Sequence, residues 1–340
     1  MAFLSVLSYE HSFHLALSAK STDIRRAVDK PIILIFSDGD KNQFTNAKPI
    51  LDKYGFKATF DVVCNYVGKS DAYMNWNEIK TLHKEGHDIG SHSMTHARLT
   101  ELPKESIEYE VEGSKECLDN HGIKAISFEY PFSTGSENKT IVDVVAKHYE
   151  FATRGNDALM FLKCNGLKQY SQEDCKTYTD NGTPTYANKY SIRSWSHDFE
   201  KEENRFTDTE LFREFIEVVN NQSKYNKGGS IEAIPIIMYH EIGDTNNKDS
   251  ATDKDLFNKE MKYLHDNNFK LITISDLAYN EKNNYLYVKE LQPETMTVVK
   301  STPNFTEVPL TPVSATGSNV TDTMEKFTEV PLTAVSTTGS

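Results

Sequence analysis

The sequence predicts an α/β protein whose strands form a mainly parallel sheet, closed or nearly closed into a barrel. Between about residues 30 and 285, short runs rich in aliphatic and β-branched residues alternate with amphipathic stretches of helical periodicity. The first run, "PIILIF", is continuously apolar, which is typical of a parallel strand buried on both faces. Several runs end in polar residues, as expected where a barrel carries functional groups at the C-terminal ends of its strands.

The elements alternate in order along the chain. The expected strands are short, β-rich and bounded by polar or turn residues; they cover residues 31–36, 57–67, 87–92, 125–132, 232–240 and 270–274. The expected helices carry apolar residues three and four apart, and the first two end at glycines; they cover residues 45–55, 76–86, 106–122, 138–150, 209–221 and 254–268. Parallel strands joined by helical crossovers follow from this alternation.

Composition limits the kinds of function. The 340 residues are 26% charged and 38% hydrophobic, which suits one barrel of roughly 200–250 residues with appendages. The net charge of −13, without a Lys/Arg cluster, argues against nucleic acid or an anionic membrane as the main partner. No stretch reaches the roughly 18 uninterrupted apolar residues of a membrane span.

The two ends of the chain differ from its middle. Residues 1–29 are expected to be a signal peptide or an N-terminal extension, since they are apolar but lack a basic start. Residues 30–290 form the predicted globular domain. Residues 291–340 contain a Thr/Ser/Pro-rich 14-residue segment twice, identical at 12 of 14 positions, which predicts a disordered or stalk-like tail. Asn-x-Ser/Thr sites give weak support to a secreted or cell-surface protein.

The four cysteines are Cys64, Cys117, Cys164 and Cys175, and none forms a CxxC pair. A cysteine zinc site or a thioredoxin-like motif is therefore not expected. In an exported protein, a disulfide between Cys164 and Cys175 is one interpretation. Two buried free thiols and two loop thiols explain the count equally well.

The stretch "SHSMTH" places His92 and His96 four residues apart. On one helical turn such residues share a face and could both bind one ion. Surface or structural histidines at this spacing are more common, so the pair alone does not establish a metal site. Asp38, Glu129 and His240 stand at the ends of predicted strands. Together with the pair, they could line one mouth of the barrel.

Taken in order, these motifs resemble the polysaccharide deacetylases of the NodB-homology type, a carbohydrate esterase family. The resemblance covers roughly residues 30 to 285. "IFSDGD" is similar to the family's opening motif, "GHDIGSHSMTH" to its His-x-x-x-His metal motif, "FEYPF" to its Arg-x-Pro-Tyr/Phe segment, and "GGSIEAIPIIMYHEIG" to its closing strand with a histidine. The resemblance implies a distorted (β/α) barrel that hydrolyses a carbon–nitrogen amide bond, most typically the N-acetyl group of an amino sugar in a glycan.

The resemblance also implies a metal site. Asp38, His92 and His96 would bind one divalent ion. Zinc is the first expectation, and cobalt or nickel also suit a carboxylate with two imidazoles. Such an ion lowers the pKa of a water molecule and polarises a carbonyl group.

Further residues acquire roles by the same resemblance. His240 would be the general acid that protonates the departing amine. Asp198, in "WSHD", would orient His240, and Asp157 is a rival for that role. The backbone N–H of Phe132 would stabilise the oxyanion. Phe132, Ser37 and Trp195 are expected to contact the substrate.

Two residues depart from the family pattern. Ser37 occupies the position of the family's general base, the Asp that precedes the metal-binding Asp, and a serine hydroxyl is too weak a base. Loss of a positioned base costs about 10²–10⁴ in rate. Glu129 occupies the position of the arginine that normally pairs with that base.

Three interpretations of these departures remain open. Glu129 takes over as base, or the metal site works slowly without a dedicated base, or the site binds metal and sugar without turnover. The expected function is therefore a metal-dependent deacetylase with an N-acetylated glycan as partner. The alternatives are a non-catalytic carbohydrate-binding surface protein and an amidase acting on a non-sugar amide, since one metal site can cleave several kinds of amide.

Overall fold

A computed structural model of the chain describes residues 30–155, 158–162, 189–243, 251–282 and 285–289. The predictions made for residues 1–29 and 291–340 lie outside the described residues, as do those for Asp157, Cys164 and Cys175.

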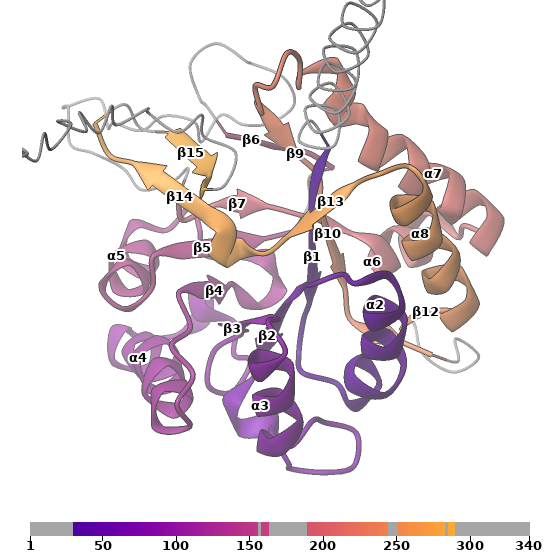
Figure 1. Cartoon of the computed structure of the whole chain (residues 1–340). Helices are drawn as coiled ribbons and strands as arrows, with labels where there is room; N and C mark the ends of the chain where they lie inside the picture. Colours follow the sequence, from indigo (N-terminus) through magenta and orange to yellow (C-terminus); the bar gives the residue numbers. More distant parts are fainter. Residues whose placement is uncertain (1–29, 156–157, 163–188, 244–250, 283–284, 290–340) are drawn as a thin grey trace, which may run out of the picture. The chain divides into compact units, whose positions relative to one another are not determined.

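A large sheet forms the centre of the fold (Figure 1). Its strands are β1 (Pro31–Phe36), β2 (Thr59–Val62), β3 (Asp88–Ser91), β4 (Ser127–Glu129), β5 (Phe151–Arg154), β7 (Ile192–Arg193), β8 (Trp195–Ser196), β10 (Ile236–Tyr239) and β13 (Lys270–Ile272). Three small pairs accompany it: β6 (Met160–Phe161) with β9 (Ala233–Ile234), β11 (Glu241–Ile242) with β12 (Ala251–Thr252), and β14 (Leu277–Asn280) with β15 (Tyr285–Val288).

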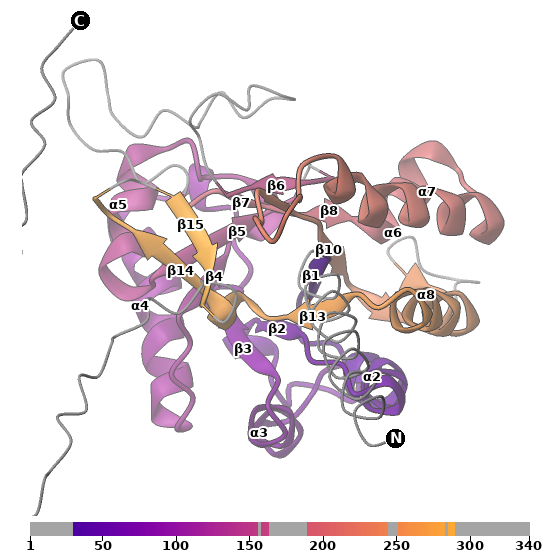
Figure 2. The same cartoon turned by 45° about the horizontal axis from the view of Figure 1, so that its top comes forward.

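Helices lie around the outside of these strands (Figures 1 and 2). They are α2 (Lys48–Tyr54), α3 (Trp76–Lys84), α4 (Lys104–Asn120), α5 (Lys139–His148), α6 (His197–Asn204), α7 (Asp208–Asn221) and α8 (Lys254–Asp266). Short turns of other helical types are η1 (Gln43–Ala47, a π-helix), η2 (Cys64–Tyr66), η3 (Leu99–Glu101), η4 (Pro131–Ser133), η6 (Gln222–Lys224) and η7 (Ile274–Asp276).

The large sheet is a nearly closed barrel. Its order is β7-β5-β4-β3-β2-β1-β10-β8, with β13 also paired to β1, and each of these pairs is parallel. The two strands at the ends of this order, β7 and β8, are separated in the chain by Ser194 alone. The chain therefore joins the two edge strands of the sheet directly, which nearly closes the sheet. The predicted (β/α) barrel is confirmed.

Several predicted elements are shorter or divided in the structure. The strand expected at 57–67 ends at Val62, where the chain turns into η2. Pro235, which has no N–H to donate, separates β9 from β10. The helix expected at 45–55 begins as η1 and continues as α2, and it ends at Gly55 with a φ of 70°, a conformation that favours glycine.

The strands bury both of their faces. On β1, Ile32, Leu34 and Phe36 pack with the helices, while Ile33 and Ile35 join a second apolar cluster with residues of β5, β10 and β14. Because side chains alternate along a strand, the residue after Phe36 continues the row of Ile33 and Ile35. That residue is Ser37, so a polar group enters the interior where the strand ends.

A disulfide joins Cys64 of η2 to Cys117 of α4, 53 residues apart in the chain. The sequence analysis allowed Cys64 and Cys117 to be free thiols, and this disulfide corrects that expectation. Spacing could not identify this pair, because only the packing of α4 against the segment after β2 brings the two sulfur atoms together.

Among the described residues, no helix is both long enough and apolar enough to cross a membrane.

Replacing both Cys64 and Cys117 with serine should lower the free energy of unfolding by about 4 kcal/mol, because a loop of this length loses considerable entropy when it is closed. Urea denaturation without reductant measures the change, and wild type unfolded in reductant should match the variant. A loss below about 1 kcal/mol would show that the loop closure contributes little.

Candidate metal centre and catalytic site

The candidate residues lie where parallel strands end. Asp38 follows β1, His92 and His96 follow β3, Phe132 follows β4, and His240 follows β10. Because parallel strands end on the same side of a barrel, this topology gathers the five residues at one mouth. The structure brings Asp38, His92 and His96 within one small cluster, as expected.

The three ligand atoms of this cluster are spaced as a metal requires. The Nε2 atoms of His92 and His96 lie 3.0 Å apart, and they lie 3.6 and 3.4 Å from Oδ1 of Asp38. Ligands of a tetrahedral zinc ion, with bonds of about 2.0–2.1 Å, are separated by about 3.3 Å. Oδ1 of Asp38 is buried and has no hydrogen-bond partner among the described residues. These residues fit a divalent ion.

His92 is held as a neutral imidazole with its proton on Nδ1, the form that a metal ligand needs. Its Nδ1 lies 3.0 Å from the backbone carbonyl oxygen of Glu129, so Nδ1–H donates there and the lone pair of Nε2 faces Asp38 and His96. Burial lowers the pKa of His92 to about 3, against the opposing charge of Asp38. Burial likewise lowers the pKa of His96. Both imidazoles are therefore neutral at pH 7.

The backbone at this mouth is strained. Asp38, His96 and Phe132 have φ values of 75°, 62° and 59°, in the left-handed region that costs an L-residue roughly 1–2 kcal/mol. Ser93 also lies there, and its Oγ accepts a hydrogen bond from the His96 N–H at 2.9 Å. Such conformations persist only where the surroundings impose them, and they concentrate at functional sites.

His240 forms a pair with Asp198, as expected. Its Nδ1 lies 3.1 Å from Oδ1 of Asp198, and its backbone N–H donates to Oδ2 at 2.8 Å. Burial opposes protonation of the ring, but the buried carboxylate of Asp198 outweighs it and raises the pKa of His240 to about 9. The charge of Asp38 also raises the pKa of His240.

Ser37 and Glu129 lie beneath the candidate ligands. Ser37 Oγ donates to both carboxyl oxygens of Glu129, at 2.8 and 2.9 Å, and both residues are buried. Oε2 of Glu129 lies 3.5 Å from Nδ1 of His92, whereas Asp38 and His96 lie at Nε2. The imidazole ring thus stands between Glu129 and the candidate ligands. This geometry does not support Glu129 as the general base, nor Ser37 as a residue exposed to substrate.

A second buried carboxyl group, that of Asp61 on β2, interacts electrostatically with Glu129, and neither of its oxygens has a hydrogen-bond partner among the described residues. Burial and then the charge of Asp88 raise the pKa of Asp61, while burial and then Asp61 raise that of Glu129. The space exists because β3 carries Gly90, where an added Cβ would stand 1.7 Å from Oδ1 of Asp61.

Two exposed phenylalanines flank the mouth. The ring of Phe132 lies 4.6 Å from that of His96, and the ring of Phe199 meets that of His240 edge-on at 5.1 Å. Each is 49% exposed. Trp195, by contrast, is 4% exposed and packs in the core against His197. The burial of Trp195 does not support its predicted contact with the substrate, because β8 turns its ring inward.

His197 is fully buried and forms a structural contact. Its Nδ1 lies 2.9 Å from Thr252 Oγ1, and its Nε2 lies 2.7 Å from Glu260 Oε1. Glu260 also accepts a hydrogen bond from the Tyr239 hydroxyl at 2.9 Å. These bonds connect α6, which carries Asp198, and β10, which ends just before His240, to α8.

Residues 25–150 match the family model described as polysaccharide deacetylase. This part of the chain is similar to the polysaccharide deacetylases. The match includes Asp38, His92, His96, Glu129 and Phe132, and it ends before Asp198 and His240, which the barrel places at the same mouth.

Individual relatives are similar over short segments. A putative polysaccharide deacetylase of Bacillus subtilis, YxkH, is 28% identical over 99 residues, covering 29% of this chain and 35% of its own length. The peptidoglycan-N-acetylglucosamine deacetylase PgdA of Listeria monocytogenes is 27% identical over 135 residues, covering 39% of this chain and 28% of its own length. The chain thus spans about a third or less of the curated relatives it matches.

A solved structure aligns over more of the chain. It is a family 4 carbohydrate esterase from Streptomyces lividans in complex with acetate, 13% identical, with a TM-score of 0.45. The alignment covers 76% of this chain and 97% of the esterase.

The pair of His240 and Asp198 predicts a titration that can be observed directly. In chelator-treated protein, we expect the His240 imidazole to titrate near pH 9 and the Asp198→Asn variant to titrate well below that value. Nuclear magnetic resonance of the histidine rings measures both midpoints. The prediction is wrong if the substitution leaves the midpoint unchanged.

The same pair should make stability depend on pH. The folded-state pKa of His240 lies above its unfolded value of about 6.5, so its contribution is fully present below pH 6.5 and disappears as pH rises through 9. For a shift of this size, that contribution is at most about 3 kcal/mol. Urea denaturation at pH 6 and pH 10 should show wild type losing more stability than Asp198→Asn.

Proposed function

We propose that this protein is a metal-dependent N-deacetylase that hydrolyses the acetamide group of an amino sugar in a polysaccharide and releases acetate. The observation that carries the proposal is the cluster of Asp38, His92 and His96, with neutral imidazoles and a buried, unpartnered carboxylate oxygen. Similarity to the polysaccharide deacetylases supports the reaction class. The PgdA relative supports an N-acetylated amino sugar as substrate.

Different residues of the chain would have different roles in this reaction. A bound divalent ion would supply a more acidic water molecule and a polarised acetamide carbonyl. His240 would be protonated at neutral pH and would donate a proton from Nε2 to the departing amine, while Asp198 holds Nδ1. The left-handed backbone at Phe132 would direct a peptide N–H toward the developing oxyanion. The exposed rings of Phe132 and Phe199 would contact the sugar.

A dedicated general base is the missing part. Ser37 is buried and hydrogen-bonded to Glu129, and Glu129 faces the side of His92 away from the candidate ligands. We infer a slow enzyme, since the absence of a positioned base costs about 10²–10⁴ in rate. The same observation favours a second function, a non-catalytic protein that binds metal and glycan without turnover.

We further infer that the protein is secreted or attached to the cell surface. The disulfide between Cys64 and Cys117 supports this, because such bonds persist mainly in oxidising compartments. The cell-wall substrate named for the PgdA relative supports it as well.

Purified protein should bind one zinc ion per chain, and either His92→Ala or His96→Ala should reduce bound zinc to background. Elemental analysis after dialysis measures this. His83→Ala, which removes an exposed histidine on α3, is the matched control and should keep full occupancy. Unchanged zinc in His92→Ala would exclude the proposed site.

Zinc-loaded wild type should release acetate from chitooligosaccharides slowly, and a chelator should abolish the release. The double variant Ser37→Asp/Glu129→Arg should be about 10²–10⁴ faster, because it restores a positioned base. Both changes are needed: aspartate alone at position 37 would face the carboxyl group of Glu129, now 2.8 Å from Ser37 Oγ. Arginine at position 129 would also compensate Asp61.

The outcomes separate the two functions. Release by wild type establishes the deacetylase. Release by the double variant alone indicates a protein that has lost its base and now binds without turnover. No release by either protein, with zinc bound, would contradict the proposed substrate class.

A further inference from the structure

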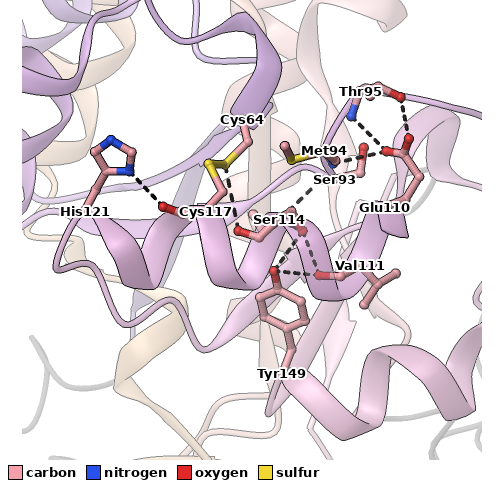
Figure 3. Close-up of a disulfide and its surroundings, with 11 residues drawn as sticks. Cys64, Ser93, Met94, Thr95, Glu110, Val111, Ser114, Cys117, His121 and Tyr149 are labelled. Atoms are coloured by element: carbon pink, nitrogen blue, oxygen red, sulfur yellow. Dashed lines mark hydrogen bonds between the residues drawn. A yellow bond between two sulfur atoms is a disulfide. The ribbon is translucent and has the colours of Figure 1, made fainter. Parts of the chain in front are cut away.

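Helix α4 presents three side chains on one face toward the loop from Ser93 to His96, which carries the candidate ligand His96. Glu110, Ser114 and Cys117 are spaced by four and three residues, which places them along a single side of a helix. Figure 3 shows this face directed at the segment that contains Ser93, Met94 and Thr95.

Glu110 binds the backbone of this loop. Its Oε2 accepts hydrogen bonds from the N–H groups of Met94 and Thr95, at 3.1 and 2.8 Å, and its Oε1 accepts one from the Thr95 hydroxyl (Figure 3). The side chain is buried, with 3% of the residue exposed. Leaving the N–H groups of Met94 and Thr95 without an acceptor in this buried place would be costly.

The opposite side of the loop is held by η2. The N–H of Cys64 donates to the Ser93 carbonyl at 3.2 Å, and that of Asn65 donates to the Met94 carbonyl at 2.9 Å. The disulfide then fixes η2 to α4. The Ser91 hydroxyl, at the end of β3, also donates to Ser114 at 2.9 Å. The loop from Ser93 to His96 is thus held between two elements that are covalently joined.

This loop needs support from outside itself. Ser93 and His96 both have positive φ, and neither is glycine. Without external bonds, a short loop would relax toward commoner backbone conformations, and the His96 ring would leave Asp38. The internal bond from His96 N–H to Ser93 Oγ closes the turn but does not fix its orientation relative to the barrel.

We propose that Glu110 is a positioning residue for the metal centre: by binding the Met94 and Thr95 backbone, it holds His96 where its Nε2 meets His92 and Asp38. The inference rests on the proposed metal site and assigns a role to a residue on α4 outside the candidate ligands. It predicts that zinc affinity depends on the length of the Glu110 side chain and not on its charge.

Two substitutions separate the effect of the length of the Glu110 side chain from the effect of its charge. Glu110→Gln keeps the length and an oxygen acceptor but removes the charge, whereas Glu110→Asp keeps the charge and shortens the side chain. Glu112→Gln, at an exposed position on the same helix, is the matched control. The two changes at Glu110 are milder than truncation to alanine, and circular dichroism checks that each variant is folded.

Zinc affinity, measured by competition with a chromogenic chelator, is the first readout. We expect Glu110→Gln and Glu112→Gln to stay within about threefold of wild type. Glu110→Asp should bind zinc about 10–100-fold more weakly, the usual effect of losing a residue that orients a ligand. Equal affinities for Glu110→Asp and wild type would overturn the proposal. A larger loss in Glu110→Gln than in Glu110→Asp would also overturn it, because charge would then be decisive.

Hydrogen exchange of the Met94 and Thr95 amides in chelator-treated protein is the second readout, and it needs no metal. Exchange should be faster in Glu110→Asp than in wild type and unchanged in Glu112→Gln. If wild type binds no zinc, the proposed metal function fails, and this readout still tests whether Glu110 holds the loop. Unchanged exchange in Glu110→Asp would overturn the positioning role independently of any metal.

Discussion

The parallel pairing of β1 with β10 is the constraint on which the site depends. Ile33 to Phe36 lie in register with Ile236 to Tyr239, and the Ser37 N–H continues the ladder to the Tyr239 carbonyl at 3.0 Å. The pairing joins segments about 200 residues apart and sets Asp38 and His240 at the ends of adjacent strands. Gln43 strengthens the junction, donating from its side chain to the carbonyls of Ser37 and His240. The candidate ligand and the candidate acid therefore share one support.

Beneath this mouth the barrel interior changes from aliphatic to polar. Ile33 and Ile35 fill it lower down, whereas Ser37, Asp61 and Glu129 occupy the level just under the candidate ligands. Burying two carboxyl groups together is costly unless one is protonated. Burial raises the pKa of both Asp61 and Glu129, which favours a protonated carboxyl group, and the Ser37 hydroxyl donates a hydrogen bond to Glu129. Glu129 consequently belongs to the support of His92, whose Nδ1 it also binds through its backbone carbonyl.

The site is supported differently on its two sides. On the side of His96, α4 and η2 hold a strained loop through Glu110 and a disulfide. On the side of His240, the buried Glu260 links His197 and Tyr239, the chain neighbours of Asp198 and His240. In both cases a buried glutamate from a surrounding helix binds the chain neighbours of a candidate residue, and does not bind the candidate residue itself. The helices thus position the candidate residues through their neighbours in the chain, by backbone N–H groups in one case and by side chains in the other.

Periodicity and the types of side chain at strand ends were enough to predict the alternating elements, the parallel barrel and the candidate metal ligands. The order of the motifs also indicated the deacetylase family. Which groups face each other depends on contacts between elements of the folded protein. The partner of Cys64 and the role of Glu110 depend on how α4 packs, and no local pattern encodes that packing.

The inward turn of Trp195 on β8 and the exposure of Phe199 on α6 depend in the same way on the course of these two elements. The orientation of Glu129 shows the difference most clearly. Its type and position suggested a base, but the ring of His92 lies between its carboxyl group and the candidate ligands. Sequence fixes the order of chemical groups along the chain, whereas their directions in space depend on contacts between segments that are far apart in it.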